Sequence, residues 1–241
     1  EVKVELQKIS QIQTEALPAD ANAMAPSHSA HAPATASSHH DASAGVEPEK
    51  SLGWLKNGNT RYRKGFLRKD GQAKKDIERL STGQKPHAIV LSCSDSRVPP
   101  EIVFDQKLGE IFVVRTAGEA LDANVIGSIE YAVEHLGSRL IVVMGHTSCG
   151  AVKAAMGTIN GGDAGSPALN HLVADIHPRL QSFKNSTPTK DVQPESWANT
   201  KGVARDLVAQ SKILSEKIRS GEVKIVSALY HLGSGEVQFA E

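Results

Sequence analysis

The chain has 241 residues and equal numbers of basic and acidic side chains, 27 of each. This length is enough for one sizeable hydrophobic core. The balanced charge argues against a nucleic-acid-binding protein, which would carry an excess of Lys and Arg. No stretch approaches the roughly 20 apolar residues that cross a bilayer, so we expect a soluble protein with no membrane span. Its two cysteines, Cys93 and Cys149, are too few for a secreted disulfide scaffold but enough for one bridge or part of one metal site.

Residues 1–47 differ in composition from the rest of the chain. Ala, Ser, His, Pro and Asp dominate residues 16–44, and no aromatic side chain precedes Trp54. Such a segment has too little apolar surface to offset the entropy of ordering it. We therefore predict a flexible tail over 1–47 and a folded domain over 48–241. The tail carries four histidines that we interpret as unstructured polar residues, with weak metal capture as the alternative: His28, His31, His39 and His40.

The start of the sequence bears on where the protein is located. The first residue is Glu rather than Met, and the Ala/Ser/His-rich leader fits a processed chain. We expect a periplasmic or otherwise exported protein, with a cytoplasmic location as the alternative.

The folded part is predicted to begin with a helix near Pro48. Apolar side chains at Leu52, Leu55, Tyr62 and Phe66 fall roughly on one helical stripe. Gly65 and the Asp70-Gly71 pair interrupt this pattern, and a short helix around Ile77 and Leu80 follows.

Four short apolar runs follow that helix. Continuous apolar runs of this length are typical of strands buried on both faces. They cover residues 88–91, 111–114, 140–144 and 224–229.

Helical patterns separate these runs. We predict helices over residues 122–136, over 152–156, after Pro167 and over 201–219. Strands that alternate with helices indicate an α/β fold, with a mostly parallel sheet flanked by helices. Residues 236–239, after a Gly-Ser-Gly turn, are predicted to form an edge strand.

Unusual side chains follow two of the predicted strands, where sites of such sheets collect. The first strand ends at Cys93, and the third ends in His146 with Cys149 three residues later. If these strands are neighbours, two thiols and an imidazole meet, and this set suits zinc. Because the chain has no third Cys, a carboxylate, a water or a substrate must take the fourth position, as in catalytic zinc sites. Spacing alone leaves open two buried thiols and a core histidine.

Asp95 and Arg97 follow Cys93 at intervals of two residues. In extended geometry the three side chains would point to the same side. Arg97 could then hold Asp95 through a two-pronged pair, in competition with zinc for the carboxylate. An ordinary ion pair at a strand end is the alternative.

These motifs together resemble the bacterial β-class carbonic anhydrases. The resemblance rests on Cys93-Ser-Asp-Ser-Arg97 followed by His146-x-x-Cys149, with Phe-Val-Val-Arg-Thr-Ala-Gly at 112–118, Ser-Ile-Glu-Tyr-Ala-Val at 128–133 and Gly-Glu-Val at 235–237. The motifs occur in the family's order, and the likeness covers residues 54–239.

The resemblance implies reversible hydration of CO2 to bicarbonate and a proton by zinc-bound hydroxide, with one Zn2+ per subunit. Cys93, His146 and Cys149 match the family's zinc ligands. Asp95 and Arg97 match its catalytic pair: Arg97 holds Asp95 in an open form, and in the closed form of some members Asp95 becomes the fourth zinc ligand.

The resemblance also implies substrate-binding residues and an assembly. Gln84 matches a glutamine that hydrogen-bonds the substrate, Phe112 and Tyr131 match apolar pocket walls, and the N–H of Gly150 would help to position the substrate. The family forms homodimers or multiples of dimers such as tetramers, with sites near the subunit interface.

Two positions depart from the family pattern. Val90 stands where members with a regulatory bicarbonate pocket have Trp, and Gln84 favours the always-open subclass. Glu119 replaces the usual Asn after Thr-Ala-Gly and has no assigned role. Two alternative functions stay open: hydrolysis of CS2 or COS with the same ligands, and a zinc-binding protein without turnover.

Overall fold

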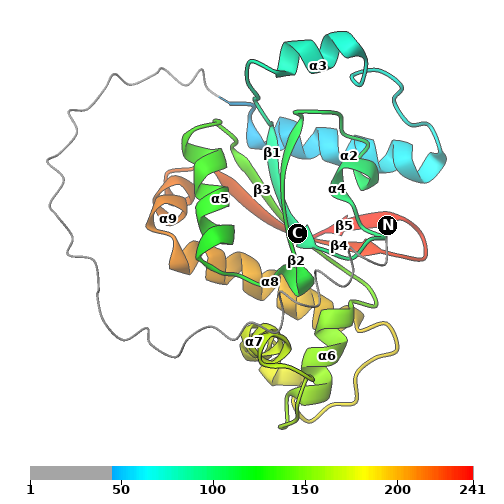
Figure 1. Cartoon of the computed structure of the whole chain (residues 1–241), viewed down its shortest axis with the longest axis vertical. Coiled ribbons are helices and arrows are strands. Elements are labelled where there is room, and N and C mark those ends of the chain that lie inside the picture. The colour runs from blue at the N-terminus through cyan, green and yellow to red at the C-terminus, as the bar shows by residue number, and fades with distance from the viewer. Residues whose placement is uncertain (1–44, 241) are drawn as a thin grey trace, which may run out of the picture. The chain divides into compact units, whose positions relative to one another are not determined.

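The computed structural model describes residues 45–240, and within this range five strands form one sheet (Figure 1). The strand order is β2-β1-β3-β4-β5; the first four strands run parallel, and β5 pairs antiparallel with β4. The predicted α/β fold and edge strand are confirmed. The strands are β1 (Ala88–Cys93), β2 (Ile111–Thr116), β3 (Leu140–His146), β4 (Lys224–His231) and β5 (Glu236–Phe239).

The predicted tail, apart from residues 45–47, lies outside the described residues, and so do its four histidines. The proposed boundary at Pro48 coincides with the first residue of helix α2 (Pro48–Lys64). Among the helices of the described range, none is both long and apolar enough to cross a membrane.

Helices cover both faces of the sheet, because successive strand residues point to opposite sides. Ile89 and Leu91 pack in the cluster on one face, whereas Val90 packs in the cluster on the other. Helices α5 (Ala123–Glu134), α8 (Gln193–Gln210) and α9 (Lys212–Arg219) supply the first cluster. Helices α2, α4 (Pro100–Val103), α6 (Gly150–Thr158) and α7 (Pro167–Ile176) supply the second. The short α3 (Lys74–Leu80) buries no residue.

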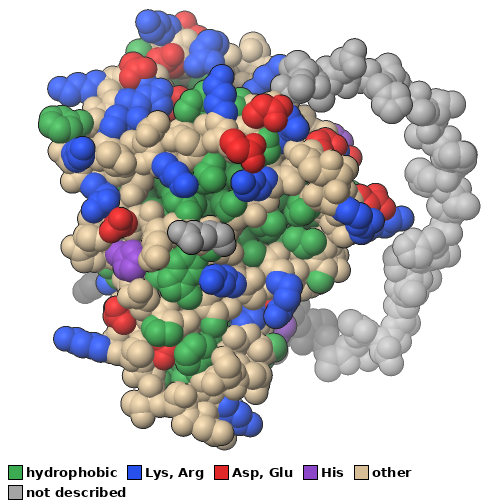
Figure 2. All heavy atoms as spheres, turned by 180° about the vertical axis from the view of Figure 1, so that it is seen from behind, with side chains coloured by type: hydrophobic (Ala, Val, Ile, Leu, Met, Phe, Trp, Pro, Cys, Tyr) green, Lys and Arg blue, Asp and Glu red, His purple; other side chains and the backbone are tan. Residues whose placement is uncertain are grey.

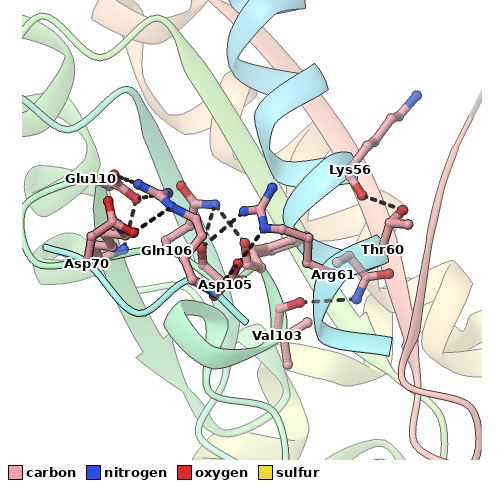
Figure 3. Close-up of polar contacts among 12 residues, drawn as sticks. Lys56, Thr60, Arg61, Asp70, Val103, Asp105, Gln106 and Glu110 are labelled. Carbon is pink, nitrogen blue, oxygen red and sulfur yellow. Dashed lines mark hydrogen bonds and ion pairs between the residues drawn. The ribbon is translucent and has the colours of Figure 1, made fainter. Parts of the chain in front are cut away.

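Polar side chains attach α2 to the loops around β1 and β2 (Figure 3). Arg61 Nε donates to Asp105 Oδ2 at 2.5 Å, and Arg68, in the loop that follows α2, forms a two-pronged pair with Glu110 at 2.9 Å. Buried Asn59 donates to the carbonyls of Val103 (3.1 Å) and Gly235 (2.8 Å) and accepts from the N–H of Val237 (3.0 Å). This asparagine therefore ties α2 both to α4 and to the β4–β5 hairpin.

The helix predicted over 201–219 is wrong as a single element. The structure has two helices there, and α8 begins eight residues earlier, at Gln193. Ser211 separates them because its backbone is extended (φ −118°, ψ 113°), and its Oγ accepts from the N–H of Leu214 at 3.1 Å as the N-cap of α9. Gly65 ends α2 in the left-handed conformation at φ 72°, so Phe66 lies beyond the helix and is exposed.

Candidate metal centre

The site lies where the direction of the strand order reverses. Strand β2 pairs with one edge of β1, and β3 pairs with the other edge of β1. In open α/β sheets, ligands bind at the carboxyl ends of strands at such a switch point. Cys93 is the last residue of β1, His146 is the last residue of β3, and Cys149 is the N-cap of α6. The predicted neighbourhood of the two strand ends is confirmed.

The turn between His146 and Cys149 is fixed by hydrogen bonds from two other segments. The N–H of Thr147 donates to the carbonyl of Tyr230 at 2.9 Å, and the N–H of Ser148 donates to the carbonyl of Asp191 at 2.5 Å. Ser148 takes a left-handed φ of 58°, which is uncommon for a residue other than glycine. This turn brings both side chains of the His-x-x-Cys motif to the end of β1.

Three ligand atoms, one each from Cys93, His146 and Cys149, lie within 4.8 Å of one another, and all three residues are buried. The two sulfurs are 4.0 Å apart and form no disulfide. Two sulfurs each about 2.3 Å from a tetrahedral zinc would be about 3.8 Å apart, so this separation fits a shared metal ion.

The imidazole of His146 is also oriented for a metal. Its Nδ1 lies 2.9 Å from the carbonyl oxygen of Thr147, so Nδ1–H is the donor there and Nε2 carries the lone pair. Buried Nε2 has no hydrogen-bond partner. An unpaired buried nitrogen that faces two thiols is what a zinc ion would satisfy.

One hydrogen bond between the two thiols shifts their pKa values in opposite directions. The hydrogen bond from the Cys149 thiol lowers the pKa of Cys93 to about 4, against the opposing effect of burial. The same bond and burial raise the pKa of Cys149 far above its usual range. The N–H of Gly118 adds a donor to Cys93 Sγ at 3.4 Å.

Asp95 and Arg97 form the predicted two-pronged pair. Arg97 Nε donates to Asp95 Oδ1 at 2.9 Å, and Nη2 donates to Oδ2 at 2.7 Å. The pair forms through a turn rather than an extended strand, because β1 ends at Cys93 and the N–H of Arg97 also donates to Oδ1 at 2.9 Å. These bonds hold the pKa of Asp95 well below its usual range. Its Oδ2 lies 3.8 Å from His146 Nε2, beside the candidate metal position.

The predicted substrate-binding residues do not all gather at this centre. Gly150 is the first residue of α6, next to Cys149, and is exposed. Gln84 is exposed in the loop before β1, at the opposite end of the strand from Cys93. Phe112 is in register with Ile89, about 13 Å along the sheet from Cys93 at about 3.3 Å per residue.

Tyr131 is 49% exposed on α5 and stacks against His135, with ring centroids 5.1 Å apart. Gln84 and Phe112 therefore lie toward the opposite ends of their strands from Cys93, and Tyr131 lies on the surface.

Sequence reasoning singled out Glu119 without a role and missed Asn199. Both side chains are buried and hydrogen-bonded to each other next to Gly118. Asn199 lies one helical turn before buried Val203 on α8. A polar residue on the buried stripe of that helix was the available signal, but α8 was predicted to start after it.

Comparisons with known proteins show which family the chain belongs to. A family model described as "Carbonic anhydrase" matches residues 88–237. The chain is 41% identical over 181 residues to "Carbonic anhydrase 2" of Mycobacterium tuberculosis, which covers 75% of this chain and 87% of that protein. It is 39% identical over 184 residues to "Carbonic anhydrase" of Mycolicibacterium smegmatis, with 76% and 89% covered. The chain therefore belongs to the carbonic anhydrase family.

Solved structures place the fold within one class of that family. A tetrameric β-carbonic anhydrase from Sordaria macrospora superimposes with a TM-score of 0.63 at 21% identity, over 79% of this chain and 96% of that one. A β-carbonic anhydrase from Aspergillus fumigatus gives a TM-score of 0.62 at 22% identity, over 80% and 90%. The fold is that of the β-class enzymes.

Proposed function

We propose that this protein is a zinc carbonic anhydrase that catalyses the reversible hydration of CO2 to bicarbonate and a proton. The observation that carries the proposal is the buried cluster of Cys93, His146 and Cys149 at the switch point of the sheet. Three protein ligands and an open fourth position are the arrangement of catalytic rather than structural zinc. Family membership and relatives named as carbonic anhydrases support the same reaction.

The residues of this centre would have different roles in catalysis. Cys93, His146 and Cys149 would hold zinc, which lowers the pKa of a coordinated water to about 7 and so supplies a hydroxide nucleophile at neutral pH. Asp95 stays ionised because Arg97 holds both of its oxygens, so it can accept a hydrogen bond from the nucleophile and orient it. The N–H of Gly150, at the start of α6, is a donor for an oxygen of the substrate.

The hydrogen bonds from Arg97 to Asp95 favour the open form of the site, in which Asp95 is not a zinc ligand. Three hydrogen bonds from Arg97 occupy Asp95, and a carboxylate so engaged competes poorly for a metal. A protein that only binds zinc does not require a carboxylate held in this way. The arrangement therefore supports a catalytic zinc site rather than one that only binds the metal.

We further propose that the active site is completed by a second copy of the chain. Gln84 and Phe112 lie at the amino ends of β1 and β2, far from their own Cys93, and Tyr131 is exposed. Large hydrophobic side chains are exposed on the described surface, among them Phe66 and Leu108, and Figure 2 shows hydrophobic side chains exposed between Lys and Arg on one face; exposed apolar surface of this kind is common at interfaces. The Sordaria macrospora enzyme is tetrameric; for the present chain a homodimer is the minimal unit, and a tetramer is the larger assembly.

A subunit-mixing experiment tests this arrangement. Gln84→Leu chains keep their metal ligands, and Cys149→Ser chains keep Gln84. A mixed dimer then contains one complete site if Gln84 serves the partner, and none if it serves its own chain. We expect the mixed dimer to regain about half of the parental rate, on the reasoning that one of two sites is complete. Mixed dimers no more active than the two parent variants would contradict the proposal.

Turnover of CO2, COS and CS2 by the zinc-loaded protein tests the reaction itself. We expect rapid CO2 hydration in a stopped-flow assay, lost after chelation and restored by zinc, with slow turnover of the sulfur compounds. Faster hydrolysis of COS or CS2 would assign the site to the alternative reaction. A location outside the cytoplasm stays a prediction.

A further inference from the structure

Glu119 is a buried acidic residue that the proposed mechanism does not use. Its side chain is 1% exposed and lies between β3 and α8: Oε2 is 3.5 Å from where a Cβ on Gly145 would be, and Asn199 contacts it from α8. Its backbone takes a left-handed φ of 56°, directly after Gly118 at φ 63°. The carboxyl group thus lies beside the residue that precedes His146 and beside the loop that contacts Cys93.

The hydrogen bonds around this carboxyl group leave two acceptors unpaired. Asn199 Nδ2 donates to Glu119 Oε2 at 3.1 Å and to the carbonyl of Gly118 at 2.8 Å. The other oxygen of each side chain, Glu119 Oε1 and Asn199 Oδ1, is buried without a partner. An ionised carboxylate can only accept, so it cannot satisfy the amide oxygen, whereas a protonated acid can donate to it. A buried acceptor left unpaired destabilises the folded protein.

The electrostatic surroundings favour the protonated acid. Burial raises the pKa of Glu119 well above its usual range. Asn199 and Arg179 oppose the shift. Arg179 is itself engaged by two carboxylates, those of Asp175 (2.9 Å) and Asp206 (2.8 Å), so its charge is largely balanced elsewhere.

We propose that Glu119 is a neutral carboxylic acid paired with the Asn199 amide by two hydrogen bonds, and that this acid–amide pair positions the donor to the metal ligand Cys93. The acid O–H donates to Asn199 Oδ1 while Asn199 Nδ2 donates to Glu119 Oε2. The second N–H of Asn199 fixes the Gly118 carbonyl, and the Gly118 N–H donates to Cys93 Sγ. The inference rests on the proposed metal site, and Glu119 and Asn199 act through Gly118 as positioning residues.

Infrared spectroscopy tests the protonation state without metal or turnover. The difference spectrum between the parent protein and Glu119→Gln at neutral pH should contain the C=O stretching band of one protonated carboxylic acid, present only in the parent. A spectrum that loses only carboxylate bands would overturn the neutral acid. If the parent binds no zinc, the proposed function fails while this test still decides the acid–amide pair.

Zinc release to a chelator tests the positioning role. Glu119→Gln keeps a donor and an acceptor facing Asn199, so it should release zinc at close to the parental rate. Asn199→Asp loses the donors to Gly118 and to Glu119, and should release zinc about 10- to 100-fold faster, the usual effect of losing a partner behind a metal ligand. Asn160→Asp is the matched control, because Asn160 Nδ2 also donates to a backbone carbonyl but at an exposed site.

Two further measurements separate positioning from general destabilisation. The thiolate-to-cobalt charge-transfer band of the Co2+-substituted protein should shift in Asn199→Asp and not in Asn160→Asp, and urea unfolding shows whether each variant is folded. Zinc release from Glu119→Gln as fast as from folded Asn199→Asp, or parental release from Asn199→Asp, would overturn the positioning role. If Asn199→Asp does not fold, the infrared band and the Glu119→Gln release rate decide.

Discussion

Gly145, the residue before His146, leaves space that its neighbours occupy. A Cβ added there would lie 2.1 Å from Thr200 Oγ1 on α8, whereas ordinary contacts begin at 3.4 Å. The Thr200 hydroxyl is buried and donates to the carbonyl of Ser196 at 2.8 Å, so it has little room to move. Overpacking of this kind costs about 1–3 kcal/mol, offset by about 0.5–1 kcal/mol from replacing a strand glycine. We expect Gly145→Ala to lower the free energy of unfolding by about 1–2 kcal/mol.

A double-mutant cycle isolates the cause of that loss. Thr200→Ala removes the hydroxyl that the new methyl group would meet, so Gly145→Ala should cost less in the Thr200→Ala background, with a coupling energy of about 1–2 kcal/mol by urea denaturation. Gly157→Ala on α6 is the control, since a Cβ there has nothing within 4 Å and alanine favours helix. Additive effects of the two substitutions would refute the close contact between β3 and α8 on which the placement of the site depends.

Three further predictions concern α2, histidine protonation and the catalytic pair. Asn59→Ala removes partners from three backbone groups of α4 and the β4–β5 hairpin and should cost about 2–4 kcal/mol of unfolding free energy in urea. Burial lowers the pKa of His87 below its ordinary value of 6.5, so in acid the unfolded chain binds more protons than the folded protein. The free energy of unfolding should therefore fall as the pH is lowered from about 7.5 to about 5, and it should fall less in His87→Gln. Arg97→Ala should keep its zinc but hydrate CO2 about 10- to 100-fold more slowly, because Asp95 is then free to bind the metal. A parental rate would contradict this. Arg205→Ala is the control, because Arg205 is an exposed arginine that also forms an ion pair.

Much of the fold could be predicted because each strand is a short apolar run bounded by polar residues. The runs starting at Ala88, Ile111, Leu140 and Lys224 all form strands, each extending past its predicted end. The α8–α9 region was harder, because Ser211 breaks the helix through a cap rather than through Gly or Pro. Such a break depends on a side-chain bond that composition does not reveal.

The sequence placed the candidate metal ligands at the ends of two strands. Whether the ligands lie close together depends on the order of the strands in the sheet, which the sequence does not show. Cys93 and His146 are 53 positions apart and come together because β3 lies directly beside β1. The Asp95–Arg97 pair was correctly expected, although the turn that forms it was not. The pairing of Glu119 with Asn199 could not be foreseen, because it joins two elements 80 residues apart.

Zinc stoichiometry measured together with CO2 hydration in Cys149→Ser tests the central claim most directly. The parent should hold one zinc per chain and hydrate CO2 at neutral pH, and the folded variant should lose both, because two remaining ligands bind zinc weakly. Cys149 Sγ lies 4.0 Å from Cys93 Sγ, a separation at which both sulfurs can bind one zinc ion. A folded Cys149→Ser protein with stoichiometric zinc and the parental hydration rate would contradict the assignment of the site.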